Sequence, residues 1–286
     1  MRRILRPFIE GFLRLMSRRL LPTALASRDI ALRLDAQLKR DAVFSARVEN
    51  ARVLQRIRDV VARVVRGATP ESQASRDAGT APLVLSPADA KLQILRQLQA
   101  TGYQPDPRDI GTIKDLTSDK RLDLIVETNE ATQHGQGRWV ASQDPDTLDA
   151  FPAWELVRIS PALEPRDWRT RWMIAGGQTF GGRMIALKNA PVWEGLGSSR
   201  LFADALDNPF PPFAFNSGMD VRDVSRRECE ALGVIRPGQA APAPNPQAAR
   251  NAAQVDAEAF DADMQAALAR DPDLVLDGGV LRSREP

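Results

Sequence analysis

The sequence predicts an α+β protein, because helical and strand-forming stretches are grouped along the chain rather than alternating. Apolar residues recur at helical spacing through residues 2–66 and again through residues 86–143. From Trp154 the period changes to the alternation of a strand, and pairs of glycines separate short apolar pieces. We therefore expect a helical N-terminal region, a central domain of mixed helices with a small irregular sheet, and a helical C-terminal tail.

The composition bounds the kinds of site that the chain can carry. Its 286 residues suffice for one or two cores, and 43% apolar and 27% charged residues are typical of a soluble globular protein. A single cysteine, Cys229, excludes an internal disulfide, and a single histidine, His134, argues against a histidine-based triad or metal centre. We expect no catalytic residue, no metal and no cofactor. No stretch approaches the roughly 20 uninterrupted apolar residues of a membrane-spanning helix.

The net charge of +2 hides an asymmetry between the two ends. Residues 1–70 hold 16 Lys and Arg against 6 Asp and Glu, whereas residues 251–286 hold 3 against 8. A basic end of this kind is suited to an acidic protein surface, nucleic acid or anionic lipid, although a merely solvated charged face has the same composition.

The first stretch, residues 2–21, has the pattern of an amphipathic helix that ends before Pro22. Three interpretations remain open: a helix that docks on a protein partner, a membrane-surface helix and a targeting peptide. Arginines interrupt the apolar run, which argues against a targeting peptide, and docking or packing within the chain is favoured. Helical spacing continues through residues 27–66, which predicts a long basic helix or helix pair with its arginines on the outer faces. The basic residues of the first stretch are Arg2, Arg3, Arg6, Arg14, Arg18 and Arg19.

Two helices are predicted in the middle of the chain. After a linker at residues 67–85, Ser86 as N-cap and a proline at the first helical position begin a helix that Gly102 stops. Its expected apolar stripe is Leu92, Leu95 and Leu98. A second helix covers about residues 118–143, where Gly135 and Gly137 indicate either close backbone packing or a break.

Irregular α+β structure is expected beyond these helices. Residues 144–150 are predicted to form a turn or short helix, residues 155–159 a strand and residues 188–193 an extended piece. Residues 220–232 read as a helix, the proline-rich residues 236–250 as a flexible linker and residues 254–269 as an acidic helix. The expected domains are 1–66, 67–85 (linker), 86–235, 236–250 (linker) and 251–286.

A stiff aromatic loop at residues 208–219 organises the central domain. Its three prolines exclude a helix or central strand, and its three phenylalanines are too apolar to remain in water. We expect the loop to pack on the tryptophan-rich segment 168–193 of its own domain, with docking on another subunit as the alternative. The predicted core and contact residues are Trp154, Trp168, Trp193, Phe210 and Phe213.

Three other motifs are interpreted as structural. The pairs Gly176-Gly177 and Gly181-Gly182 lack the Gly-Lys-Ser/Thr ending of a phosphate-binding loop. Arg166-Asp167 beside Trp168 is read as a salt bridge with a stacked ring. Cys229 has a polar helical pattern and no neighbouring base, so nucleophilic catalysis is not expected.

The order of five segments resembles the phage Mu F-like minor head protein family. The segments are residues 121–129, residues 151–158, Arg166-Asp167-Trp168, Pro191-Val192-Trp193 and residues 208–213, and the resemblance covers about residues 86–235. Trp168 and Arg169 stand where a histidine is common in the family. Residues 215–218 stand where the family has His-Pro-Asn-Cys, so no metal or redox role is expected here.

The resemblance implies a structural minor head protein of a tailed bacteriophage rather than an enzyme. It implies a virion protein inside the head, present in the host cytoplasm during assembly, that contacts the portal or major capsid protein and packaged double-stranded DNA. A homo-oligomer stays open, and a membrane partner is not expected. The alternatives are a nucleic-acid-binding protein without a virion role and a membrane-active protein. The candidate interaction residues are Arg2, Arg3, Arg6, Arg18, Arg19, Trp168, Phe210 and Phe213.

Overall fold

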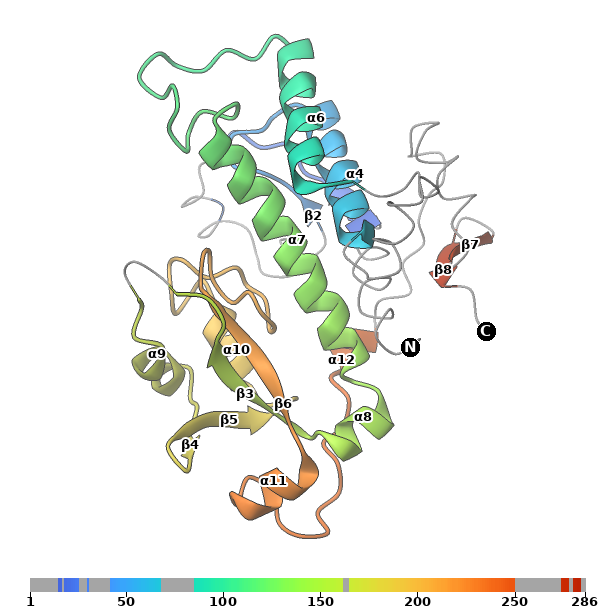
Figure 1. Cartoon of the computed structure of the whole chain (residues 1–286), viewed down its shortest axis with the longest axis vertical. Helices are drawn as coiled ribbons and strands as arrows, with labels where there is room; N and C mark the ends of the chain where they lie inside the picture. Colours follow the sequence, from blue (N-terminus) through green and yellow to red (C-terminus); the bar gives the residue numbers. More distant parts are fainter. Residues whose placement is uncertain are drawn as a thin grey trace. The chain divides into compact units, whose positions relative to one another are not determined.

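The computed structural model describes residues 15–16, 18–25, 30, 42–67, 85–161, 165–249, 274–277 and 280–283. Helices and a small antiparallel sheet make up these ranges, which confirms the α+β class (Figure 1). None of the helices within them is long and apolar enough to cross a bilayer. The elements are β1 (Arg19–Leu20), β2 (Ala42–Val43), α4 (Ala51–Gly67), α6 (Pro87–Ala100), α7 (Asp119–Ala141), α8 (Pro145–Ala150), β3 (Ala153–Arg158), α9 (Trp168–Ile174), β4 (Thr179–Phe180), β5 (Arg183–Leu187), α10 (Val192–Gly197), β6 (Met219–Val224), α11 (Arg226–Ala231), α12 (Pro246–Ala249), β7 (Leu274–Asp277) and β8 (Val280–Ser283).

The chain forms two compact units, and the division falls within α7, between Gly137 and Arg138. The first unit contains α4, α6 and most of α7, and the second contains the four-stranded sheet with α8 to α12. The expected domain at residues 86–235 therefore spans parts of both. Strands β7 and β8 pair antiparallel, so the prediction of a helical C-terminal tail is wrong at these residues, because strand pairing has replaced helix there; the predicted helix at residues 254–269 lies outside the described ranges.

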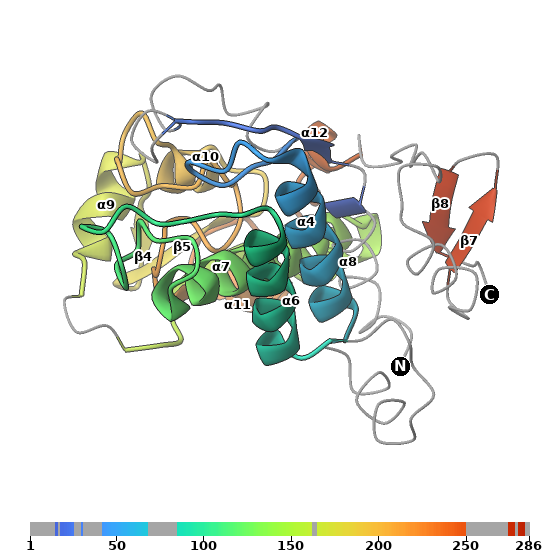
Figure 2. The same cartoon turned by 90° about the horizontal axis from the view of Figure 1, so that it is seen from above.

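The core of the first unit is built on α4 and α6, which lie side by side in both views (Figures 1 and 2). Asn50 caps α4 by accepting hydrogen bonds from the backbone N–H groups of Arg52 and Val53. The middle of α4 is buried on every side. Arg58 is only 5% exposed and donates to Asp59, so the prediction of a helix with outward arginines is wrong at this position.

The predicted helices at residues 2–21 and 27–66 are also wrong in part. Residues 19–20 form β1, which pairs in parallel with β2 at residues 42–43. The following residues stay extended, because Leu21 N–H donates to Val43 O at 2.9 Å and Thr23 N–H to Val48 O at 2.9 Å. Tertiary pairing has thus replaced helical propensity in both segments. Residues 1–14 lie outside the described ranges.

The caps of α6 are as predicted, but its apolar stripe is only partly so, since Leu98 is buried and Leu95 packs against the core while Leu92 does not. Ser86 accepts a hydrogen bond from Asp89 N–H at 3.1 Å, and Gly102 follows the helix with a φ of +72°. The buried residues are Ala90, Ile94 and Leu98, whereas Leu92 is 43% exposed. Helix α7 runs unbroken through two buried glycines, so close packing rather than a break is the correct alternative there.

The second unit is organised around an antiparallel sheet with the order β4-β5-β3-β6. Successive residues of β3 face opposite sides. Trp154 and Leu156 face the large aromatic cluster with residues of α9 and α10, and α10 lies behind β3 and β6 in Figure 1. Ala153 faces the other side, where it packs with Val224 and with Cys229 of α11.

Three predictions in the second unit need correction. Residues 219–224 form strand β6 rather than the start of a helix, because all six pair with β3. The helix begins only where Ser225 accepts a hydrogen bond from Glu228 N–H. Residues 192–197 form helix α10 rather than an extended piece. The proline-rich segment after residue 235 is held to the unit, since Ala243 O accepts from Asn189 and Asn245 N–H donates to Gln143.

The outer edge of β6, on the side away from β3, is covered by side chains. Ile159 N–H donates to Gly218 O, so the alternating ladder points the backbone groups of Met219 and Val221 outward. Met219 N–H donates to Ser217 Oγ, and Val221 N–H donates to Asp220 Oδ1 at 2.7 Å. The Arg138 guanidinium, paired with Asp220, reaches Val221 O. We name these contacts the β6 edge cap.

Candidate functional site

The aromatic loop of residues 208–219 packs into the core of the second unit. Phe210 and Phe213 are 0% exposed, while Phe215 remains 38% exposed. Phe213 stacks on Trp193 with ring centroids 5.9 Å apart and an interplanar angle of 18°. The prediction that this loop packs on the tryptophan-rich segment is therefore confirmed. Phe210 instead meets Trp139 at 5.4 Å, a contact from α7 that the sequence did not indicate.

Trp193 lies at the centre of this cluster. Besides Phe213, its ring meets Trp154 at 5.7 Å and Trp172 at 5.3 Å, both edge to face. Its Nε1–H donates to Leu187 O at 2.8 Å, so the only polar atom of the side chain is satisfied. Edge-to-face and offset ring pairs of this kind stabilise a core beyond the burial of their area.

The backbone of the loop is fixed at several points. Leu206 N–H donates to Phe213 O at 3.0 Å, and the buried Asn208 side chain donates to Pro212 O at 3.1 Å. Asp207 N–H donates to Gly197 O at 2.7 Å, which ties the start of the loop to the end of α10. The loop is thus part of the fold and not a free recognition arm.

Two arginines connect helix α9 and the residues just before it to Asp204, which precedes the aromatic loop. Arg166 and Arg171 both pair with Asp204, at 2.7 and 2.8 Å. The Arg171 guanidinium carbon lies 4.8 Å from the Trp168 ring centroid and 4.0 Å from that of Phe202. The predicted salt bridge between adjacent Arg166 and Asp167 is therefore wrong. Asp167 instead caps α9 through Thr170 N–H, as a residue before a helix commonly does.

The structure places four of the eight candidate interaction residues inside the molecule. Trp168, Phe210 and Phe213 are at most 4% exposed, so they stabilise the unit and offer no surface to a partner. Arg18 is 8% exposed and donates to Gln136 Oε1 at 3.0 Å, so it is not an outward basic residue. Arg19 lies in β1. Arg2, Arg3 and Arg6 lie outside the described ranges.

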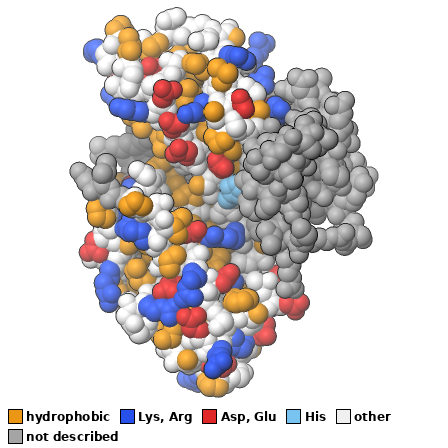
Figure 3. Space-filling model, viewed as in Figure 1, with side chains coloured by type: hydrophobic (Ala, Val, Ile, Leu, Met, Phe, Trp, Pro, Cys, Tyr) orange, Lys and Arg blue, Asp and Glu red, His pale blue; other side chains and the backbone are white. Residues whose placement is uncertain are grey.

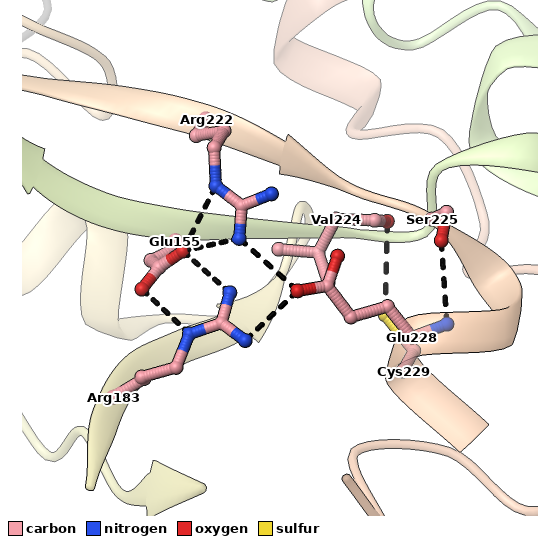
Figure 4. Close-up of polar contacts among 7 residues, drawn as sticks. All are labelled: Glu155, Arg183, Arg222, Val224, Ser225, Glu228 and Cys229. Atoms are coloured by element: carbon pink, nitrogen blue, oxygen red, sulfur yellow. Dashed lines mark hydrogen bonds and ion pairs between the residues drawn. The ribbon is translucent and has the colours of Figure 1, made fainter. Parts of the chain in front are cut away.

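Four charged side chains form a closed ring (Figure 4). The ring lies on the face of the sheet opposite the aromatic cluster, because Glu155 alternates along β3 with Trp154 and Leu156 of that cluster. Glu155 of β3 accepts from Arg183 of β5 and Arg222 of β6, each at 2.6 Å. Glu228 of α11 pairs with the same two arginines at 2.8 and 3.1 Å. The two guanidiniums hold the pKa of Glu155 below its ordinary value, Arg183 having the larger effect. The ring joins three strands to α11, and sequence reasoning missed it because strand partners were unknown.

Replacing Glu155 by glutamine is expected to destabilise the second unit by about 2 kcal/mol, because the partly buried Arg183 and the more exposed Arg222 lose their shared, largely buried carboxylate. Since the folded-state pKa of Glu155 is lowered, its contribution is present above the unfolded-state pKa and is lost as pH falls through the folded-state value. Urea unfolding between about pH 3 and 7 should therefore show a steeper acid loss for the natural chain than for the variant.

The matched control is Asp106→Asn, which removes a carboxylate from the exposed Arg108–Asp106 pair. This change is expected to leave the unfolding midpoint unaltered, because exposed ion pairs contribute little. Equal acid dependence in the natural chain and the Glu155→Gln variant would contradict a stabilising role for the ring.

Lys188 is the second charged group that the sequence did not single out. Its side chain is fully buried after β5, with Nζ 2.7 Å from Asp223 Oδ1 and 5.8 Å from the Trp154 ring centroid. Trp154 Nε1–H donates to the same carboxylate oxygen at 3.0 Å. Burial lowers the pKa of Lys188, and the Asp223 carboxylate opposes this shift. The pair joins β6 to the turn after β5.

The remaining sequence motifs have structural roles in the second unit. Gly181 and Gly182 have φ values of +56° and +79° and form the two-residue turn between β4 and β5, as expected of glycines in a tight hairpin. Cys229 is 0% exposed rather than on a polar face, and burial raises the pKa of its thiol. The sequence around Cys229 suggested a polar helix face, but α11 has only 6 residues, which are too few to show a helical periodicity.

The part of the chain that the structure describes offers no metal centre. Within it, no group of three His, Cys, Asp or Glu side chains is placed to hold a metal ion. The His134 imidazole lies 3.8 Å from Glu130 one turn earlier in α7. Comparison of the chain with protein-family models, with curated proteins and with solved structures finds no match.

Proposed function

We propose that the chain is a structural minor head protein of a tailed bacteriophage, which acts in head assembly near the portal. The proposal is supported by the positions of the segments that resemble the phage Mu F-like family, because most of them fold together in the second unit. Residues 151–158 contain the whole of β3 and the two residues before it, and Arg166-Asp167-Trp168 leads into the first turn of α9. Pro191-Val192-Trp193 begins α10, and residues 208–213 lie in the same aromatic cluster. Four of the five segments thus build one unit.

The contact with the portal or capsid protein is assigned to surfaces other than the aromatic loop. The buried rings hold the second unit in one shape, and a rigid scaffold lowers the entropy cost of assembly. Contact with packaged DNA is assigned to the basic N-terminal third, without Arg18. On the face shown in Figure 3, the described residues carry basic and acidic side chains intermixed, which supports placing any DNA contact elsewhere.

The test is to purify particles from the strain that carries the gene and to separate heads from tails. We expect mass spectrometry to find the chain in heads at a few copies per particle, protected from external protease. Its absence from purified heads would contradict the proposal. DNA contact is tested separately with the full chain and duplex DNA, where affinity should fall steeply with salt if phosphates are bound. Affinity that does not change with salt would remove the DNA contact and leave the head assignment standing.

A further inference from the structure

The guanidinium of Arg121, in the first turn of α7, is buried without a carboxylate. Arg121 is 8% exposed, and its Nη2 group donates to Ser45 Oγ at 2.6 Å and to Ala46 O at 3.1 Å. In the described part of the chain its Nε has no hydrogen-bond partner, and no Asp or Glu side chain forms an ion pair with it. A buried charge normally has a partner of opposite sign, because removing an unpaired charge from water is costly.

The groups around Arg121 supply hydrogen-bond donors and positive charge. Burial lowers the pKa of Arg121, the nearby Tyr103 phenol opposes this shift, and the Arg47 guanidinium adds to it. The buried Ser45 hydroxyl oxygen accepts from Arg121, and in the described residues its hydrogen has no acceptor. The Tyr103 hydroxyl likewise accepts from Leu116 N–H at 3.1 Å and keeps its hydrogen available. Several donors therefore meet here without an anionic acceptor.

Arg47 is the solvent-exposed member of this group. Its side chain is 47% exposed, and its φ of +63° lies in the left-handed region, which non-glycine residues occupy mainly at constrained and functional positions. Its carboxylate partner, Asp109, is 3.7 Å away and lies equally far from Lys114. Arg47, Lys114 and Arg121 thus share one carboxylate, which leaves a formal charge of +2.

We propose that Arg121, Ser45 and Arg47 form a binding site for a phosphate group, which reaches the buried donors from the side of Arg47. A guanidinium matches the geometry of phosphate oxygens, and a second guanidinium with a hydroxyl can contact the remaining oxygens of a tetrahedral anion. The dipole of α7 adds positive potential at its first turn. The phosphate is either inorganic or part of a nucleic-acid backbone. The inference does not rest on the proposed phage function.

The first test is isothermal titration calorimetry of the full chain with sodium phosphate at constant ionic strength. The natural chain is expected to bind one phosphate. Arg47→Gln should raise the dissociation constant by at least about 10-fold, because a hydrogen bond to a charged group contributes about that factor. The matched control is Arg96→Gln, an exposed arginine of α6 in the same unit, which should leave phosphate binding unchanged. Arg121→Lys keeps the charge but loses the planar fork, so it should also weaken binding.

A second test distinguishes the two sources of phosphate. The full chain is titrated with labelled duplex DNA in the presence and absence of inorganic phosphate, again at constant ionic strength. If the site holds a nucleic-acid phosphate, inorganic phosphate should displace the DNA, and Arg47→Gln should weaken DNA binding more than Arg96→Gln does. If it holds free phosphate, the two variants should bind DNA alike while only Arg47→Gln loses phosphate.

Two results would overturn the site. One is phosphate binding that Arg47→Gln leaves unchanged. The other is a natural chain that binds no phosphate and whose DNA affinity, if any, does not depend on Arg47. Neither result bears on the head assignment, which the composition of purified heads decides.

Discussion

Replacing Gly197 by alanine is expected to destabilise the second unit by about 3 kcal/mol or more, at the upper end of the cost of overpacking. A Cβ at this position would lie 1.9 Å from the backbone oxygen of Asn208 and 2.8 Å from its carbonyl carbon. Neither partner is a flexible side chain that moves aside. The start of the aromatic loop would have to leave α10, which would also break the hydrogen bond from Asp207 N–H to Gly197 O.

The measurement for Gly197→Ala is urea unfolding followed by tryptophan fluorescence, since the tryptophans of the second unit report on its cluster. Gly238→Ala is the control, because that glycine has a φ of +73° with open space around the added Cβ. It should cost only about 1 kcal/mol, from backbone conformation alone. Similar losses for the two variants would show that close approach of Gly197 and Asn208 is not what limits stability.

Replacing Trp193 by alanine is expected to cost about 3–5 kcal/mol, the range for large aromatic deletions in a core. This is comparable with the whole stability of an ordinary domain, so the second unit is expected to lose its fixed packing. The ring is 1% exposed and contacts Trp154, Trp172 and Phe213. Its removal separates α10 from both the sheet and the aromatic loop.

Near-ultraviolet circular dichroism and thermal unfolding check this expectation. Phe215→Ala is the matched control in the same loop region, because Phe215 is 38% exposed and its removal leaves the cluster intact. Its effect should stay within about 0.5 kcal/mol. Trp193→Phe should fall between the two, since one ring remains for stacking. An unchanged midpoint for Trp193→Ala would mean that the loop is held by its backbone contacts and not by its rings.

The sequence predicted those features that depend on neighbouring residues. The starts of α6 and α8 follow from a serine or an aspartate directly before a proline. The aromatic loop was located because three prolines exclude regular structure within it, wherever it lies. Local chemistry of this kind is decided within a few residues.

Features that depend on distant partners were missed. Strand β6 was read as a helix, because its pairing with β3 joins residues more than sixty positions apart. The sequence predicted that Arg58 lies on an exposed helix face, but it is buried. Helical spacing of apolar residues identifies one buried face of a helix, and it does not reveal a helix that is buried on all sides. The charged ring and the Lys188–Asp223 pair need the sheet order, which no local pattern supplies.

The β6 edge cap has a consequence for how copies of this chain can associate. Uncapped edge strands recruit identical strands and can propagate cross-β filaments. Here two outward amides already donate to Ser217 and Asp220, and an outward carbonyl already accepts from Arg138. An incoming backbone would have to displace all three contacts. Growth of a shared ladder from this edge is therefore disfavoured, and amyloid-like templating there is expected to stay slow even where many copies of the chain are close together.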